Sequence, residues 1–254
     1  NMHCAFCIVP QTRGEERGRT IEEITNEVHT LAAKGIREVT LLGQIVNLYG
    51  RHEFPKRDET SPFVQLLEAV CAVPGIARVR FTSPHPIGFR SDLIEAFTRL
   101  PNLVEHVHLP LQSGSDRILK AMNRPYTTAF YEELVARLRQ RIPDVAITTD
   151  LIVGYPGETE AFHQNTLAFA QRVGFQKTHV FRYSPRPRTK AADMVDDVDD
   201  ATKKRRHAEL QAVVDASTRS FAAKYIGRTM PVLLENSEGT AGTLSGFTTN
   251  YIRV

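Results

Sequence analysis

The sequence predicts an α/β fold in which parallel strands alternate with helices. Short runs of β-branched residues recur along the chain, a polar or glycine-bearing loop follows each run, and a helical pattern follows each loop. This alternation is typical of βα units around a parallel sheet. The 254 residues suffice for one barrel-sized α/β domain. The expected strands are residues 38–42, 78–82, 105–109, 145–149 and 177–182.

The helices between these strands carry recognisable start signals. Thr20 and Glu23 form a capping-box pattern before a helix that ends near Gly35. Ser61-Pro62 opens a second helix, and Cys71 lies on its apolar face, which predicts a small core residue. Ser91 opens a third. Further helices are expected at 128–141, 158–172 and 202–225, and the last begins with a basic run at 203–207 that is typical of a solvated face.

Polar and glycine-rich clusters follow the predicted strands. In a (βα) barrel the loops after the strands form the catalytic face. Any single cluster is explained equally well as an ordinary polar surface loop. Their recurrence after successive strands favours one shared site. The clusters are residues 43–47, 83–86, 112–115, Asp150 and 183–186.

Composition narrows the class of protein. No apolar run approaches the length of a membrane-spanning helix, which predicts a protein without a membrane partner. Three cysteines cannot form a fully paired disulfide framework, so a reducing, cytoplasmic setting is expected. The formal net charge of +3 permits a nucleic-acid partner without requiring one.

Two of the three cysteines form a C-x-x-C pair, Cys4 and Cys7. This pair alone is compatible with half a zinc site, a redox pair or part of an iron–sulfur site. A structural zinc site needs four ligands, and no second C-x-x-C follows. The spacing fits two of the three cysteines of a cluster with one open iron. Phe6 between them is either an aromatic wall beside that iron or simple loop packing.

Segment 150–158 joins a buried strand to a helix through Gly154 and Gly157. Glycine lets the backbone approach a ligand, and a helix start presents free N–H groups. The segment lacks the dinucleotide-binding pattern and a phosphate-loop lysine, so alone it is a weak nucleotide signal. Asp150 is the stronger candidate, as a carboxylate at the end of a strand. The alternative is a helix cap or a loop salt bridge.

Together these segments resemble the radical S-adenosylmethionine methylthiotransferases. In that family's C-x-x-x-C-x-x-C motif, Cys4 and Cys7 match the second and third cysteines, and the first is expected directly before Asn1. Further ordered blocks match at residues 41–47, 80–86, 108–116, 150–159 and 183–187. Blocks 43–47 and 83–86 resemble the MiaB branch, which acts on isopentenyladenosine beside the tRNA anticodon. Ser113 stands where the ribosomal-protein branch usually has histidine.

The resemblance implies a partial (βα)6 radical-SAM barrel without its first strand, completed by the long helix, over residues 1–226. Residues 227–254 are then the beginning of a small β-barrel TRAM domain that contacts RNA. Residues 229–235 and 251–254 are its expected strands. The family's N-terminal domain, which holds a second [4Fe–4S] cluster, is expected to lie outside this chain. The fragment alone is therefore expected to be inactive.

The resemblance also implies cofactors, site residues and partners. Cys4 and Cys7 would ligate a [4Fe–4S] cluster, and Asp150 and Gln112 would be catalytic. The partners are the tRNA anticodon loop and an electron donor such as flavodoxin or ferredoxin, and the protein is expected to be a cytoplasmic monomer. The residues implied to bind S-adenosylmethionine are Phe6, Gln44, Asn47, Gln112, Ser113, Asp150, Gly154 and Gly157.

Three questions stay open at this level. The same chemistry on threonylcarbamoyladenosine or on a ribosomal-protein aspartate is the nearest alternative. A non-catalytic, metal-binding RNA-interaction module is the alternative of another class. Arg188 stands where the family usually has glycine, and it either strains a turn with positive φ or adds an RNA phosphate contact, for which Arg186 is also a candidate.

Overall fold

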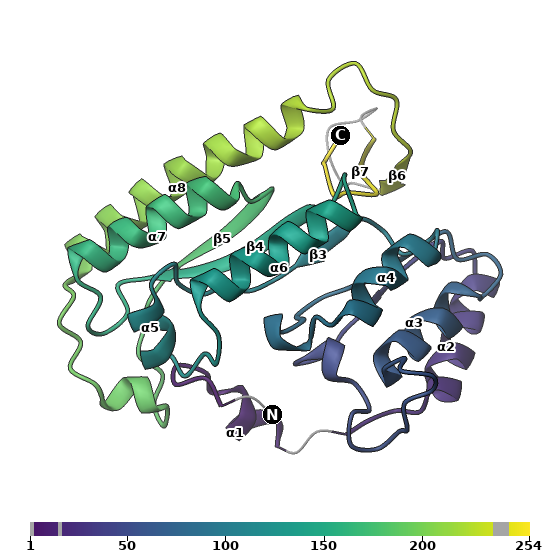
Figure 1. Cartoon of the computed structure of the whole chain (residues 1–254), viewed down its shortest axis with the longest axis horizontal. Coiled ribbons are helices and arrows are strands. Elements are labelled where there is room, and N and C mark those ends of the chain that lie inside the picture. Colours follow the sequence, from purple (N-terminus) through teal and green to yellow (C-terminus); the bar gives the residue numbers. More distant parts are fainter. Residues whose placement is uncertain (1–2, 15–16, 236–243) are drawn as a thin grey trace.

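The computed structural model describes residues 3–14, 17–235 and 244–254, and its centre is a parallel sheet (Figure 1). Strand β1 (Glu38–Leu41) pairs with β2 (Arg78–Phe81), and β4 (Ala146–Val153) lies between β3 (His106–His108) and β5 (Lys177–Arg182). Backbone bonds around Val79 join the two groups: its N–H donates to the Asn102 carbonyl (2.7 Å), and its own carbonyl accepts from Val104 (3.2 Å). All five expected strands are confirmed.

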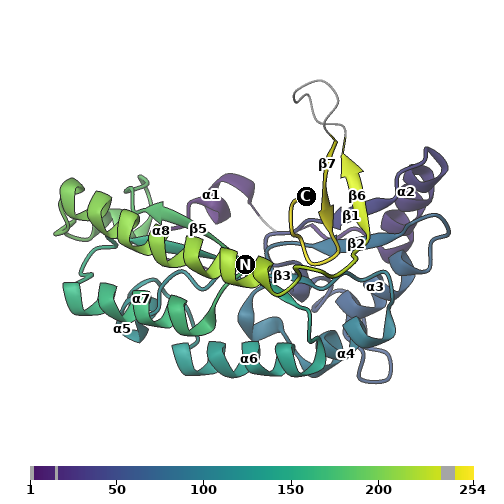
Figure 2. The same ribbon diagram turned by 90° about the horizontal axis from the view of Figure 1, so that it is seen from above.

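Helices cover one face of these strands (Figure 2). The capping box of Thr20 and Glu23 opens the first long helix, as expected, and Ser61 caps the next. Thr127 and Thr159 cap two further helices by accepting bonds from backbone N–H groups. The helices are α2 (Ile21–Ala33), α3 (Pro62–Cys71), α4 (Ser91–Arg99), α6 (Thr128–Arg141), α7 (Glu160–Val173) and α8 (Asp200–Ala223).

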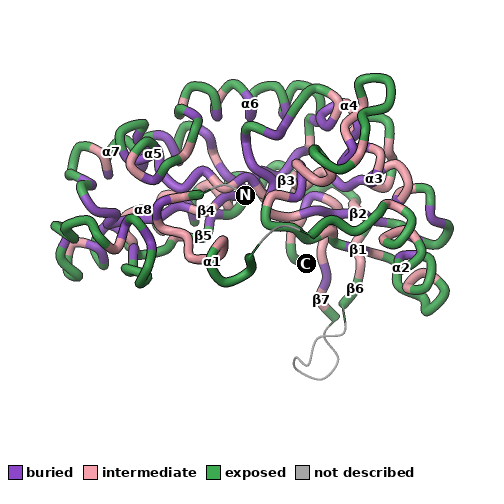
Figure 3. Tube along the Cα trace, turned by 90° about the horizontal axis from the view of Figure 1, so that it is seen from below, coloured by how far each residue is buried: buried purple, intermediate pink, exposed green. Residues whose placement is uncertain are grey.

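The core lies between the sheet and these helices, and buried segments run along the strands in Figure 3. Phe63 of α3 and Phe81 of β2 meet edge to face, with ring centroids 5.2 Å apart. Tyr131 of α6 is fully buried, and its hydroxyl donates to the Leu109 carbonyl (2.7 Å). Cys71 packs against this core, and burial raises the pKa of its thiol to about 12. Its predicted role as a small core residue is thus supported.

Strand β4 is longer than the sequence predicts. It was expected to end at Thr149 but continues to Val153, because β5 pairs with it up to Arg182. Asp150 therefore lies within the strand and not in the loop that follows. Short elements that the periodicity did not reveal are α1 (Val9–Arg13), α5 (Asp116–Ala121) and the 3-10 turns η1 (Val46–Leu48), η2 (Pro86–Gly88) and η3 (Lys190–Asp193).

The basic run at the start of α8 is a solvated face only in part: Lys204 and Arg205 are exposed, as expected, but two of its cations are not. Lys203 and Arg206 are buried, at 5% and 4% exposure. Arg206 bonds to Glu158 (3.0 Å), and the Lys203 ammonium to Asp196 (2.6 Å). Arg206 therefore attaches α8 to the loop after β4, and Lys203 attaches it to the segment after β5.

The C-terminal segment forms an antiparallel pair, β6 (Val232–Glu235) and β7 (Ser245–Thr248), which projects from the face opposite the helices (Figure 2). A strand within 229–235 is confirmed. A strand at 251–254 is wrong, because Tyr251 has a φ of 65° and only Arg253 bridges to Phe247. Within the described residues, no helix is both long and apolar enough to cross a bilayer.

Candidate functional site

The turn that contains Cys4 and Cys7 lies at the carboxyl-terminal edge of the sheet. Its Ala5 is buried and bonds twice through its backbone: its N–H donates to the Met122 carbonyl (2.9 Å), and its carbonyl accepts from Ala191 (2.8 Å). The Cys7 N–H donates to the Cys4 carbonyl (3.1 Å), and both cysteines are partly exposed. The backbone bonds of Ala5 therefore fix the turn, and the two cysteines on either side of it are not fully buried.

Phe6 belongs to an aromatic group beneath this turn. Its ring meets Tyr155 edge to face, with centroids 6.5 Å apart, and Tyr155 in turn meets Tyr183 at 5.3 Å. Tyr155 directly follows Gly154, and Tyr183 directly follows β5. The structure thus brings the cysteine turn next to the ends of β4 and β5, as expected from the strand-end clusters.

Arg124 is a site residue that sequence reasoning missed. Its guanidinium donates to the Cys4 sulfur (3.4 Å), the Tyr126 hydroxyl (2.7 Å) and the Pro110 carbonyl (2.8 Å). Burial alone would lower its pKa, but Tyr126 and Cys4 outweigh that effect and raise it. The sequence does show an arginine after the block 112–116, but only the fold shows that its guanidinium contacts Cys4.

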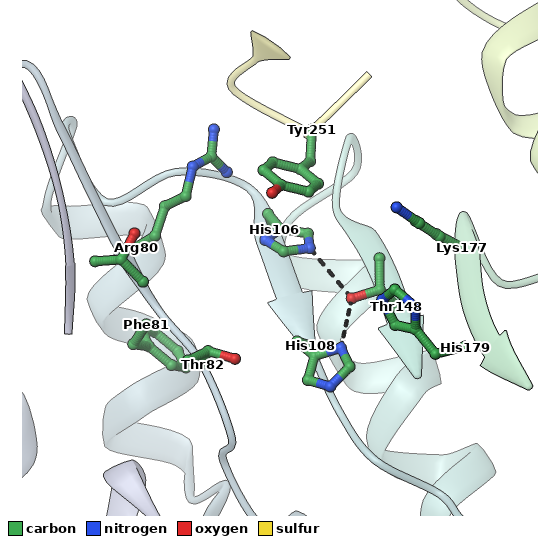
Figure 4. A pocket seen from close by; sticks show the side chains of 10 residues that line it. Arg80, Phe81, Thr82, His106, His108, Thr148, Lys177, His179 and Tyr251 are labelled. Carbon is green, nitrogen blue, oxygen red and sulfur yellow. Dashed lines mark hydrogen bonds between the residues drawn. The ribbon is translucent and has the colours of Figure 1, made fainter. Parts of the chain in front are cut away.

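Figure 4 shows a cluster of His106, His108 and Thr148 on the inner face of the sheet, and Asp150 contacts this cluster through His108. The Asp150 carboxylate lies 3.3 Å from Nε2 of His108, and Nδ1 of His108 lies 3.0 Å from the Thr148 hydroxyl. That same hydroxyl lies 3.2 Å from Nε2 of His106. The hydroxyl has one hydrogen, so at least one of the two rings donates to it.

This cluster lines a cavity of about 340 Å³ inside the curved sheet. Burial, together with the nearby cations, lowers the pKa of His106 to about 3, so this ring is neutral at physiological pH. His106 stacks on Tyr251 of the C-terminal segment, with ring centroids 4.5 Å apart. The signal for these residues was the spacing of polar side chains at every second position, His106 and His108 on β3 and Lys177 and His179 on β5. The lining is Thr40, Arg80, Phe81, Thr82, His106, His108, Thr148, Lys177, His179 and Tyr251.

Gln112 and Ser113 face different surroundings. Gln112 has a φ of 76°, and its backbone bonds to Asp150 (2.8 Å) and Ile152 (2.9 Å), so it lies beside β4. Ser113 is fully buried, and its hydroxyl lies 3.4 Å from that of Thr166 on α7. The structure therefore brings Gln112 next to Asp150 and turns Ser113 towards a helix.

Gln44 and Asn47 also differ. Gln44 is exposed. Asn47 is buried, and its carboxamide forms two bonds with the backbone of His85, donating to the carbonyl (2.9 Å) and accepting from the N–H (2.8 Å). The His85 ring meets Tyr126 edge to face at 5.5 Å, and Tyr126 holds Arg124. Asn47 is therefore linked to the cysteine turn through side chains.

The two glycines after β4 have backbone N–H groups that are already bonded. Gly154 has a φ of 71° and donates to the Glu158 carboxylate (2.6 Å), and Gly157 has a φ of 80° and donates to Asp197 (2.7 Å). A Cβ at Gly154 would lie 2.3 Å from Cγ of Lys203. The loop is thus shaped by protein carboxylates, and α8 packs closely on it.

Arg188 also has a positive φ, of 69°, and its carbonyl accepts a bond from the Gln11 side chain. The strained-turn interpretation of this position is therefore supported, because a non-glycine side chain there is disfavoured.

Thiols are the donors that suit an iron–sulfur cluster. Within residues 3–14, 17–235 and 244–254, no group of three or more His, Cys, Asp and Glu side chains is arranged to bind a metal ion. The thiols of Cys4 and Cys7 have the donor chemistry that such a cluster requires.

Comparison with known proteins shows the family of this chain. The family model of the Radical SAM superfamily matches residues 1–170. A tRNA-2-methylthio-N(6)-dimethylallyladenosine synthase of Methylacidiphilum infernorum is 49% identical over 254 residues, 99% of this chain and 54% of the relative. A synthase of the same name from Akkermansia muciniphila is 51% identical over 248 residues, 97% of this chain and 54% of the relative. The chain spans about half the length of these relatives.

Solved structures show the same fold. The radical S-adenosylmethionine methyltransferase TsrM from Kitasatospora setae superposes with a TM-score of 0.58 at 17% identity, over 75% of this chain and 36% of that one. Methylornithine synthase (PylB) gives a TM-score of 0.57 at 14% identity, over 84% of this chain and 59% of that one. The α/β fold is thus that of a partial radical-SAM barrel. Given the family match over most of its length, the chain belongs to the Radical SAM superfamily.

Proposed function

We propose that this chain is part of a tRNA methylthiotransferase that adds a methylthio group to C2 of N6-isopentenyladenosine. The observation that carries the proposal is the Cys4–Cys7 turn, fixed at the carboxyl-terminal edge of the sheet next to the ends of β4 and β5. The two synthase relatives, which are 49% and 51% identical to this chain, support a modified adenosine of tRNA as the substrate class. The cytoplasm, where tRNA is modified, is the proposed location.

Cys4 and Cys7 would hold two irons of a [4Fe–4S] cluster. When bound, the cluster and S-adenosylmethionine supply the radical chemistry, and the protein supplies binding, orientation and exclusion of water. Phe6 and Tyr155 form an apolar floor beneath the turn that limits water beside the two thiols.

Asp150 and Gln112 are proposed to face the substrate or cofactor from β4 and the loop after β3. The contact with Nε2 of His108 (3.3 Å) fixes the orientation of the Asp150 carboxylate. The Gln112 N–H donates to the Asp150 carbonyl, and the Gln112 carbonyl accepts from Ile152. These backbone bonds hold Gln112 in a fixed position relative to Asp150.

For the other predicted cofactor residues, the structure supports different roles. Gln44 is exposed and available for direct contact. Asn47 and Ser113 have their polar atoms engaged within the protein, so we propose that they position loops. Gly157 would present the backbone carbons of its turn to a cofactor, because its N–H is bonded to a carboxylate and nothing lies within 4 Å of a Cβ built there. The corresponding side of Gly154 is covered by Lys203, so we propose that Gly154 shapes the loop.

The pair β6–β7 is proposed as the start of a TRAM RNA-binding domain from residue 227 onwards. Arg78 and Arg80 donate to the carbonyls of Phe247 (2.7 Å) and Thr249 (3.0 Å), and Tyr251 enters the cavity of the barrel. Unstacked bases of an anticodon loop are the usual target of sequence-dependent RNA recognition. We propose that this docking holds the RNA-binding segment in a fixed orientation to the barrel.

Mass spectrometry of tRNA nucleosides tests the proposal. In a strain that lacks the parent gene, methylthio-isopentenyladenosine should disappear and isopentenyladenosine should accumulate. Loss of methylthio-threonylcarbamoyladenosine instead, with methylthio-isopentenyladenosine unchanged, would reject the substrate. Unchanged levels of both nucleosides would reject the function.

A further inference from the structure

Arg124 is held rigidly with one edge of its guanidinium towards Cys4. The residue follows α5, and its backbone N–H donates to the Leu119 carbonyl (2.8 Å). Its Nε bonds to the Tyr126 hydroxyl, one terminal nitrogen to the Pro110 carbonyl, and the other to the Cys4 sulfur. Each nitrogen of the guanidinium has its own partner, so the side chain has little freedom to turn away from the sulfur.

Tyr126 fixes this arrangement from behind. Its side chain is buried, and its hydroxyl lies 3.0 Å from each of the carbonyls of Pro110 and Leu111. The Arg124 guanidinium also lies over the Tyr126 ring, 5.0 Å from its centroid. A stacked guanidinium in a fixed fork loses little further entropy when it bonds to an acceptor.

Arg124 has no carboxylate partner in the described parts of the chain, whereas Arg78, Arg80 and Arg206 each pair with a glutamate. The acceptors of its three bonds are a tyrosine hydroxyl, a backbone carbonyl and a cysteine sulfur. Because of this, its positive charge is not neutralised by a neighbouring acid. The charge is therefore available to whatever anion the cysteine turn holds.

Resting on the proposed function, we infer that Arg124 raises the reduction potential of the cluster held by Cys4 and Cys7. Reduction of a [4Fe–4S]²⁺ cluster adds one electron and one negative charge. A fixed positive charge nearby stabilises the reduced form more than the oxidised form, and a partly buried charge is weakly screened by salt. Net charge and hydrogen bonds to the sulfur atoms are known determinants of cluster potential. Arg124 is a positioning residue in this sense, because it acts through the cysteine ligand.

Redox titration of the reconstituted full-length parent protein tests this inference, followed by the electron paramagnetic resonance signal of the cluster that responds to S-adenosylmethionine. At a fixed potential, Arg124→Gln should lower the ratio of reduced to oxidised cluster at least tenfold, which is about 59 mV for a one-electron couple. Arg124→Lys keeps the charge and should restore most of the wild-type potential. Arg139→Gln is the matched control, since Arg139 also donates to backbone carbonyls, those of Val173 (2.6 Å) and Gly174 (3.1 Å), and should leave the potential unchanged.

The outcomes separate this inference from the proposed function. A cluster that forms in both wild type and Arg124→Gln at the same potential overturns the inference, and a weaker affinity for S-adenosylmethionine without a potential shift assigns Arg124 to cofactor binding instead. Failure of the wild-type protein to assemble a cluster overturns the proposed function. If Arg124→Gln assembles no cluster, Tyr126→Phe decides, because it removes the Nε partner but keeps the charge. A smaller shift in the same direction supports the inference, and an unchanged potential opposes it.

Discussion

Replacing Arg206 by methionine should destabilise the protein far more than replacing its neighbour Arg205. The Arg206 and Glu158 side chains are 5% and 0% exposed, and the guanidinium bonds to both the carboxylate (3.0 Å) and the carbonyl of Glu158 (2.8 Å). The same carboxylate accepts the Gly154 N–H. The pair therefore joins α8 to the turn that follows β4.

The expected loss of unfolding free energy for Arg206→Met is about 3–5 kcal/mol, because a buried carboxylate is left without its partner. Arg205 also bonds to two glutamates, but its side chain is 48% exposed, so Arg205→Met should cost at most about 1 kcal/mol. Glu158→Gln combined with Arg206→Met should be more stable than Arg206→Met alone. Glutamine carries no charge, and its oxygen still accepts the Gly154 N–H.

The penalty should depend on pH in a definite direction. Burial raises the pKa of Glu158, and Arg206 opposes that rise. A carboxyl with a raised folded pKa contributes stability below its unfolded pKa and loses it as the pH rises through the folded value. Loss of Arg206 raises the pKa further, so Arg206→Met should be most destabilising at alkaline pH and less so near pH 5.

Urea denaturation followed by circular dichroism, at pH 5 and pH 8, measures these differences. Equal costs for the Arg206 and Arg205 variants would refute the account of the buried pair. A penalty that grows as the pH falls would refute the assignment of the charge to Glu158.

Three further outcomes follow from backbone strain and from buried histidine. Gly154→Ala should cost more than Gly157→Ala in urea denaturation: both positions have positive φ, at about 1–2 kcal/mol each, but only at Gly154 would a Cβ press on Lys203. Arg188→Gly should raise stability by up to about 1 kcal/mol through relief of the same strain, seen as a higher melting temperature. Because the folded pKa of His106 is lowered to about 3, its stability contribution is present above pH 6.5 and is lost as the pH falls towards 3. Between pH 7 and pH 5 the unfolding free energy of His106→Gln should therefore fall by roughly 2 kcal/mol less than that of the wild type.

Much of the fold could be predicted from the sequence because local pattern and tertiary structure agree. The capping box at Thr20 opens a helix where expected, and β5 has the predicted bounds. The prediction was wrong for 251–254 because Tyr251 adopts a positive φ that no local pattern signals. The predicted strand at 145–149 was too short, because pairing with β5, a non-local interaction, extends β4 through Asp150.

The site was predictable in part. The cysteine pair and the strand-end clusters showed which edge of the sheet carries it, and the structure places Phe6 beside Tyr155 there. Roles for single side chains were less accessible, since Ser113 and Asn47 sit in motifs that suggest a ligand but bond to the protein. Arg124 could not be found, because its contact with Cys4 spans 120 residues of sequence.

Complementation of a strain lacking the parent gene tests the central claim most directly, namely that the Cys4–Cys7 turn holds the cluster of an isopentenyladenosine methylthiotransferase. The plasmid carries the full-length gene, either wild type or Cys7→Ala, with Cys71→Ala as the control for loss of a core cysteine. Mass spectrometry of tRNA nucleosides should show methylthio-isopentenyladenosine restored by the wild type and the control, and only isopentenyladenosine with Cys7→Ala. Restoration of the methylthio nucleoside by Cys7→Ala would contradict the account.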